Sequence, residues 1–96
     1  MHTVIRSYSG SQATALFDLL EERKSEVEEL IRAVSGFVSY SLLRTPDGGV
    51  SVTTCQDKTG ADESLQLART WIQENASHLD VHPPAVTEGA NILYLS

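Results

Sequence analysis

The chain has 96 residues and a net charge of −6, with 7 lysines and arginines against 13 aspartates and glutamates. This length suits a single domain spanning residues 1–96 and leaves no room for two. The acidic balance argues against nucleic acids and anionic membrane surfaces as partners, because both bind basic patches. No apolar run approaches the roughly 20 residues that cross a bilayer. The first residues lack the pattern of a signal peptide, so we expect a cytoplasmic protein.

The first third of the chain changes from a strand pattern to a helix pattern. Residues 3–8 are short and rich in β-forming side chains, and they predict a strand. Over residues 12–34, apolar side chains such as Leu16, Leu20 and Val27 recur at steps of three, four or seven. This spacing predicts one long amphipathic helix.

The rest of the chain predicts a hairpin, a second helix and a last strand. Residues 37–44 and 50–55 are β-rich and flank the turn sequence of residues 46–49, which is typical of a hairpin. Residues 59–79 carry apolar side chains at helical spacing. The final β-rich run, residues 91–95, predicts the last strand.

The predicted order is strand, helix, strand, strand, helix, strand. This β-α-β-β-α-β order indicates an α+β, ferredoxin-like fold with a four-stranded antiparallel sheet and both helices on one face. The second strand carries Phe37 and Leu43 on one face and Val38, Tyr40 and Leu42 on the other. Apolar residues on both faces imply that the face without helices is also covered. We therefore expect a homodimer in which two copies pack sheet to sheet, with two-fold symmetry.

The chain resembles the dimeric α/β-barrel superfamily, and within it the antibiotic-biosynthesis-monooxygenase-like (ABM) domains. The resemblance rests on the strand-helix opening, the segment 35–40 and the hairpin turn 44–49. Small bacterial proteins of unassigned function within this group are also similar, through residues 50–53 and 57–71. The resemblance implies a pocket between sheet and helices. It also implies activities such as cofactor-free oxygenation of aromatic polyketides, quinol oxidation or oxidative haem breakdown.

Three residues are candidates for binding a small aromatic or apolar ligand. Arg6 lies within the first strand, where its guanidinium fork could anchor an anionic or enolate-like group. Tyr40 on the second strand could donate a hydrogen bond to the same ligand, and Trp71 on the second helix could stack against it. Each residue has an alternative interpretation: Arg6 as a snorkelling side chain, and Tyr40 and Trp71 as ordinary core aromatics.

His78 is a fourth candidate, seven residues after Trp71 and thus on nearly the same helical face. The resemblance implies a haem interpretation, because haem-degrading relatives use a helical tryptophan and histidine together with an asparagine on the first strand. Residues 3–8 contain no asparagine. Histidine is also favourable near any helix C-terminus. We predict no tightly held cofactor, and no metal site, because no histidine or cysteine spacing supports one.

The sequence therefore leaves two functions open. The chain is either a homodimeric ABM-like binding protein with cofactor-free monooxygenase activity, or a non-catalytic dimeric module in which these residues belong to the core.

Overall fold

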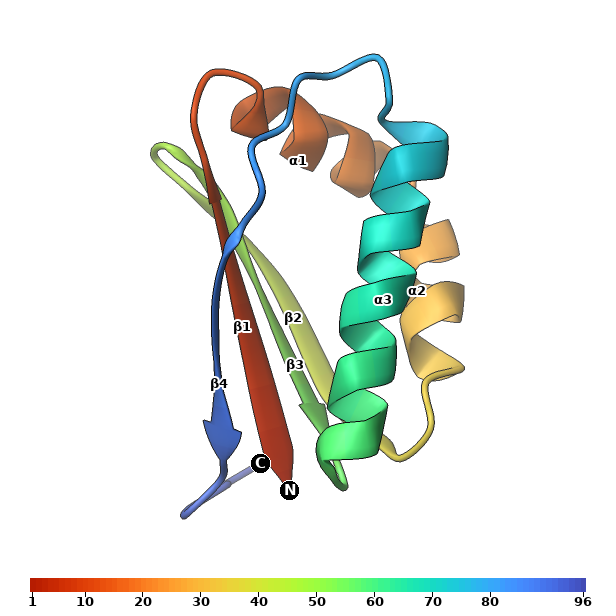
Figure 1. Ribbon diagram of the computed structural model, residues 1–96, viewed down its shortest axis with the longest axis vertical. Helices are drawn as coiled ribbons and strands as arrows, with labels where there is room; N and C mark the ends of the chain where they lie inside the picture. The colour runs from red at the N-terminus through yellow and green to blue at the C-terminus, as the bar shows by residue number, and fades with distance from the viewer.

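A computed structural model describes all residues, 1–96. The elements are β1 (His2–Ser9), α1 (Ala13–Glu22), α2 (Lys24–Arg32), β2 (Phe37–Thr45), β3 (Gly48–Cys55), α3 (Lys58–Asn75) and β4 (Ala85–Ala90). The strands form one antiparallel sheet in the order β2-β3-β1-β4. The helices form a second layer on one face of that sheet (Figure 1). The predicted α+β, ferredoxin-like fold is confirmed.

The strand register decides which side chains face the helices. Ser51 of β3 lies opposite Arg6 of β1 on one side and opposite Leu42 of β2 on the other. Thr53 likewise lies between Val4 and Tyr40. Because directly paired residues in a sheet point to the same face, these alternating positions form the inner face of the sheet.

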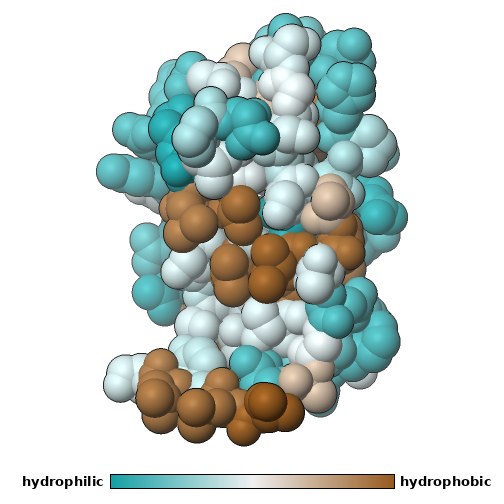
Figure 2. Space-filling view, turned by 90° about the vertical axis from the view of Figure 1, so that its left-hand side faces the viewer, coloured by the Kyte–Doolittle hydropathy of each residue, from teal (hydrophilic) through white to brown (hydrophobic).

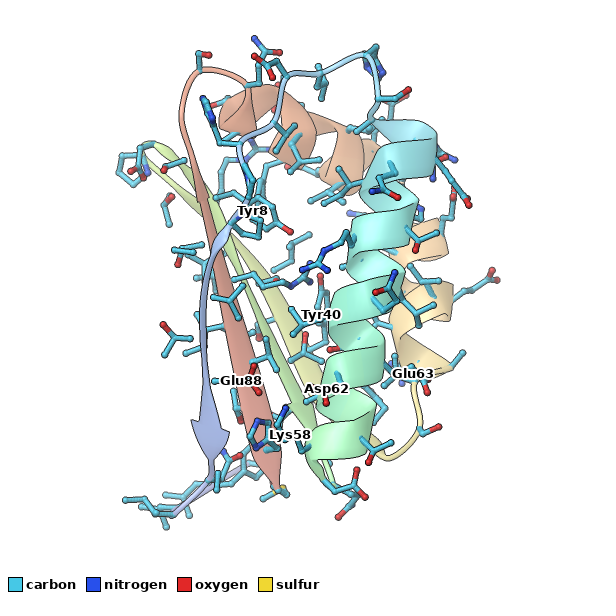
Figure 3. All side chains as sticks on the ribbon, viewed as in Figure 1. Tyr8, Tyr40, Lys58, Asp62, Glu63 and Glu88 are labelled. Carbon is cyan, nitrogen blue, oxygen red and sulfur yellow. The ribbon has the colours of Figure 1, made fainter.

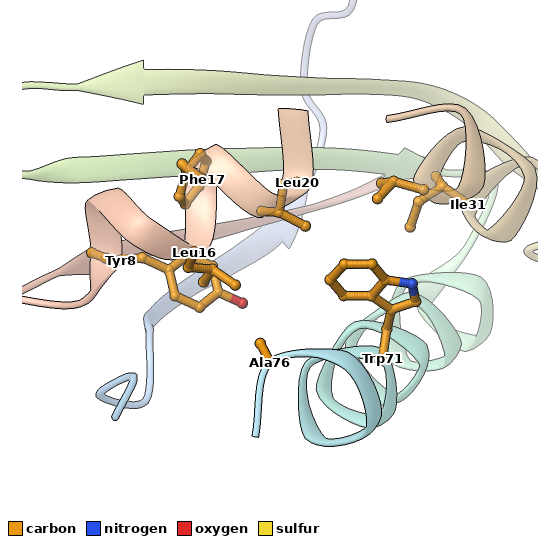
Figure 4. Close-up of a cluster of buried hydrophobic side chains, with 9 residues drawn as sticks. Tyr8, Leu16, Phe17, Leu20, Ile31, Trp71 and Ala76 are labelled. Carbon is orange, nitrogen blue, oxygen red and sulfur yellow. The ribbon is translucent and has the colours of Figure 1, made fainter. Parts of the chain in front are cut away.

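The core lies between this inner face and the helices. Its central cluster includes Tyr8 from β1, Leu16 and Phe17 from α1, Ile31 from α2 and Trp71 from α3 (Figure 4). The Tyr8 and Phe17 rings meet edge to face, with centroids 5.9 Å apart. Every helix thus contributes to one core, and Trp71 connects α3 to the others.

The periodicity predicts one long helix over residues 12–34, and this prediction is wrong in one respect. Arg23, at the gap in the apolar stripe, leaves helical geometry with φ −109° and ψ 30°, and it divides the segment into α1 and α2. Its guanidinium lies 5.3 Å from the centre of the Trp71 ring and donates hydrogen bonds to Glu26. These tertiary contacts accompany a change of direction between the two helices (Figure 1).

The predicted last strand is also wrong, because β4 is Ala85–Ala90 rather than residues 91–95. In the register with β1, Ala90 lies opposite His2, and the Asn91 amide donates to the Met1 carbonyl. Beyond that point β1 has no residues left to pair with. Position in the sheet therefore overrides the stronger β-propensity of residues 92–95.

The outer face of the sheet carries apolar residues, among them Leu43, which the dimer prediction used. The same prediction placed Phe37 on the same face as Leu43, and this is wrong: Phe37 packs against the core with Tyr40 and Leu42, because the register of β2 shifts between Phe37 and Ser39. Ile5 pairs with Val52, and Val50 pairs with Leu43, in the register that faces away from the helices. Figure 2 shows a hydrophobic band across this side of the molecule and a second patch at its lower end. After β4, Ile92, Leu93 and Leu95 are 102%, 73% and 82% exposed. No helix is both long and apolar enough to span a membrane.

Candidate functional site

A small cavity lies between the inner face of the sheet and the helices. Its walls are mostly apolar and come from β1, β2, β3 and all three helices. The residues on it that carry polar groups are Arg6, Tyr8, Tyr40, Ser51 and Trp71. Its volume is about 30 Å³, which suits one ordered water or the terminal oxygen of a ligand. We call this space the inner cavity.

Arg6 is the unusual member of this set. Its side chain is buried, with 5% of the residue exposed. One terminal nitrogen donates to the Tyr8 hydroxyl at 3.0 Å, and the guanidinium also lies 5.9 Å from the centre of the Tyr8 ring. No carboxylate forms an ion pair with it. A buried charge without a counter-charge is costly, so Arg6 lowers the stability of the fold as long as no further group neutralises it.

The inner face of β3 adds two hydroxyls without partners. Ser51 is 1% exposed and Thr53 is 0% exposed, and neither hydroxyl oxygen has a hydrogen-bond partner. Ser51 lines the inner cavity, directly opposite Arg6 in the sheet register. A buried polar group that is left unsatisfied costs about 1–3 kcal/mol. A ligand oxygen placed between Ser51 and Arg6 would satisfy both groups.

Tyr40 and Tyr8 complete the polar part of the inner cavity. Both lie on the side of the sheet that faces the helices (Figure 3). Burial raises the pKa of Tyr40, and the nearby Arg6 charge lowers it in part. Tyr40 is therefore held as a neutral hydroxyl, which can donate a hydrogen bond but is a weak base.

Trp71 forms an apolar wall of the same cavity. Its indole nitrogen donates to a Glu26 carboxylate oxygen at 3.0 Å, which fixes the orientation of the ring. Hydrogen bonds from Arg23 and then from Trp71 lower the pKa of Glu26. The structure thus brings Arg6, Tyr40 and Trp71 to one cavity, as the sequence predicted, while their role in binding stays a prediction.

Two wider grooves open next to the inner cavity. One has a volume of about 350 Å³ and lies between β1, α3, β4 and residues 81–84. It shares Arg6, Tyr8 and Ile72 with the inner cavity, and we call it the Arg6 groove. The other, about 360 Å³, lies between α2 and β2 and shares Tyr40 with the inner cavity. Sites for small molecules commonly have volumes of 300–1,000 Å³. Each groove is therefore large enough for a small molecule.

His78 is not part of this site. The predicted helix over residues 59–79 ends earlier, at Asn75, whose side-chain amide donates to the Trp71 carbonyl. His78 lies past the helix end, is exposed, and lines neither the inner cavity nor the Arg6 groove. The prediction that His78 shares a helical face with Trp71 is wrong. The haem interpretation depended on this pair, so the structure no longer supports it.

Sequence reasoning missed three residues of the site. Tyr8 lies two residues after Arg6 in the same strand, so the sequence alone indicates that both side chains point to the same face of the sheet. Ser51 becomes conspicuous only when the register places its buried, unpartnered hydroxyl opposite Arg6 at the inner cavity. Arg69 of α3 lines the Arg6 groove, and nothing in the helical periodicity separates it from any solvated arginine.

A separate charged cluster lies at the opposite end of the sheet. His2 and Lys58 both pair with Glu88, and Lys58 also pairs with Asp62 (Figure 3). Hydrogen bonding to His2, and then the charge of Lys58, lower the pKa of Glu88. No group of histidine, cysteine, aspartate or glutamate side chains is arranged to hold a metal ion. These pairs fasten β4 and α3 to the start of β1, so we assign them a structural role.

No protein-family model matches the sequence, and no curated protein matches it. Solved structures do match over nearly the whole chain. A protein of unknown function from Nitrosomonas europaea is 18% identical, with a TM-score of 0.71 and coverage of 99% of this chain and 91% of that one. The monooxygenase ActVA-Orf6 of Streptomyces coelicolor, solved with nanaomycin D, is 21% identical, with a TM-score of 0.65 and coverage of 99% and 89%.

A dimeric ferredoxin-like protein from an uncultured marine organism is 10% identical, with a TM-score of 0.67 and coverage of 99% and 95%. Identities this low establish a common fold and nothing finer. The predicted resemblance is confirmed at that level: the chain has the ferredoxin-like fold of the ABM-domain monooxygenases.

Proposed function

We propose that this protein is a homodimer that binds a small, flat, aromatic molecule with an acidic oxygen, and that it oxygenates this molecule without a tightly held cofactor. The observation that carries the proposal is Arg6, a buried guanidinium without a carboxylate partner that lines both the inner cavity and the Arg6 groove. The monooxygenase fold of one structural neighbour supports the choice of reaction.

The inner cavity matches a phenolate or enolate oxygen. Arg6 would stabilise the negative charge, and the Ser51 hydroxyl opposite it would donate a hydrogen bond. Tyr40, neutral because burial raises its pKa, would add a second hydroxyl donor. The rings of such a ligand would lie in a groove against apolar walls. This arrangement lowers the pKa of the ligand rather than that of a protein group, so the ligand's proton passes to water.

An electron-rich anion of this kind can react directly with oxygen. For anthrone, the enolate attacks dioxygen through carbon to give a hydroperoxide anion, which takes up a proton. Loss of water from the hydroperoxide then gives anthraquinone. Anthrone and one dioxygen thus yield anthraquinone and one water, and the substrate supplies all the electrons. The protein contributes the stabilised anion and an apolar surrounding that strengthens the Arg6 interaction.

The test combines ligand binding with oxygen uptake. Anthrone should raise the melting temperature of the wild-type protein by mass action and change the fluorescence of its one tryptophan. An oxygen electrode should then record uptake of one dioxygen per anthrone, at a rate above that of anthrone in buffer alone. Arg6→Met should abolish both signals, whereas Arg44→Met, which changes an exposed arginine that lines neither groove nor the inner cavity, should retain them. Binding without oxygen uptake would favour the non-catalytic module, and absence of binding would overturn the proposal.

The homodimer is supported by the apolar outer face of the sheet. Val52 and Ile5 are paired at its centre, and the hydrophobic band in Figure 2 crosses this side of the molecule. A patch of this kind on a small domain is typical of an interface. Sedimentation should give twice the chain mass of 10.5 kDa. Val52→Glu should yield monomers, while Gln66→Glu, on the exposed side of α3, should not. A monomeric wild type would contradict this part of the proposal.

A further inference from the structure

The arginines of this chain fall into two groups. Arg23, Arg32 and Arg44 each form ion pairs with carboxylates on or between helices and strands. Arg6 and Arg69 form none. In a chain with 13 acidic residues against 7 basic ones, an arginine finds a carboxylate nearby by default. We therefore look for one reason why Arg6 and Arg69 both lack a carboxylate partner.

Both unpaired arginines line the Arg6 groove. No aspartate or glutamate lines it, and His82 is a further nitrogen-bearing side chain on its wall. The carboxylates of Asp62 and Glu88 gather instead around Lys58, at the far end of the sheet (Figure 3). A protein with a net charge of −6 thus has one concave surface whose charged side chains are guanidinium groups. A groove with one sign of charge concentrates ligands of the other sign.

The two arginines occupy different depths. Arg6 is buried beside the inner cavity, whereas Arg69 is an exposed residue on α3. The same groove also presents apolar surface, including Ile72, Val86 and Pro84. A guanidinium fork matches a carboxylate with two parallel hydrogen bonds, and Arg69 has all its donors free for this.

We propose that the Arg6 groove selects an aromatic carboxylate, with Arg69 binding the carboxylate at the rim and Arg6 the acidic hydroxyl inside. This inference rests on the proposed function. It narrows the ligand to an aromatic molecule that carries a carboxylate at one end and an acidic hydroxyl at the other. Arg69 is then a specificity-determining residue rather than a catalytic one, because it lies away from the inner cavity.

The test compares two ligands that differ only at the carboxylate: 6-hydroxy-2-naphthoate and 6-hydroxy-2-naphthamide. Calorimetric titration of the wild type should show at least tenfold tighter binding of the acid than of the amide. Arg69→Gln should remove that preference by weakening the acid at least tenfold and leaving the amide within twofold. Arg69→Lys should restore part of it. Arg44→Gln, which removes an exposed arginine outside both grooves, should leave both affinities unchanged. Raising the salt concentration should weaken the acid more than the amide, because Arg69 is exposed and its interactions are screened.

The outcomes separate this inference from the proposed function. Equal affinities of the wild type for acid and amide, or an unchanged preference in Arg69→Gln, would overturn the role of Arg69 while the phenolic site at Arg6 stands. Arg6→Met should weaken both ligands, because both carry the hydroxyl. Absence of binding by either ligand would overturn both proposals. Arg69→Gln should melt within 2 °C of the wild type, since an exposed residue without an ion pair contributes little stability.

Discussion

Replacing Arg6 by methionine should stabilise the protein while removing its ligand. Methionine keeps a long, unbranched side chain but lacks the charge. An uncompensated buried charge costs several kcal/mol, although relaxation and the partial opening to the Arg6 groove reduce this. The substitution loses the hydrogen bond from the charged guanidinium to Tyr8, about 1.5–3 kcal/mol, and the contact with its ring, about 0.5–1 kcal/mol. The balance is a gain of about 1–2 kcal/mol in the free energy of unfolding.

For a domain of this size, such a gain corresponds to a rise in melting temperature of roughly 4–16 °C. Calorimetry and urea unfolding should be run at one fixed protein concentration, because the proposed dimer would make stability concentration-dependent. Arg32→Met is the matched control and should lower the free energy of unfolding by no more than about 1 kcal/mol, since its ion pair is exposed and its guanidinium lies 6.0 Å from the centre of the Phe37 ring. If Arg6→Met is instead destabilised by more than about 1 kcal/mol, Arg6 is a structural residue. The argument for an anionic ligand would then be refuted.

Three further predictions concern packing and pH. Gly49→Ala should lower the free energy of unfolding by about 1–3 kcal/mol in a urea titration, because the added methyl group overlaps the Phe17 ring. Gly89→Ala is the control and should be nearly neutral in the same titration, because open space surrounds Gly89. Hydrogen bonds from a guanidinium and an indole lower the pKa of Glu26. Its stabilising contribution is therefore present above the ordinary value of 4.5 and lost as the pH falls through the lower folded value. Glu26→Gln should accordingly flatten the acid limb of a stability–pH curve, and an unchanged limb would contradict this. Burial raises the pKa of Tyr40 above 10.0, so stability should fall as the pH rises through the folded value. Absorbance at alkaline pH should show one fewer late-titrating tyrosine in Tyr40→Phe; an identical titration would count against the burial argument.

The sequence determined much of the fold because its signals are local. The turn of residues 46–49 between two β-rich runs gives the β2–β3 hairpin, and the helical spacing of α3 gives its apolar face. It also singled out Arg6, Tyr40 and Trp71 as candidates for a pocket that the family resemblance implied, and all three line the inner cavity, while their role in binding stays a prediction.

Only the tertiary structure decided the remaining features, because each depends on contacts between distant residues. The break at Arg23 accompanies contacts with Trp71, and the position of β4 depends on where β1 runs out of pairing partners. The exclusion of His78 depends on where α3 ends. The pairing state of Arg6 and Arg69 is likewise invisible in a linear chain. Whether a guanidinium has a carboxylate partner depends on which residues the fold brings near it. The absence of such a partner at Arg6 and Arg69 is the reason why the proposed function centres on the Arg6 groove.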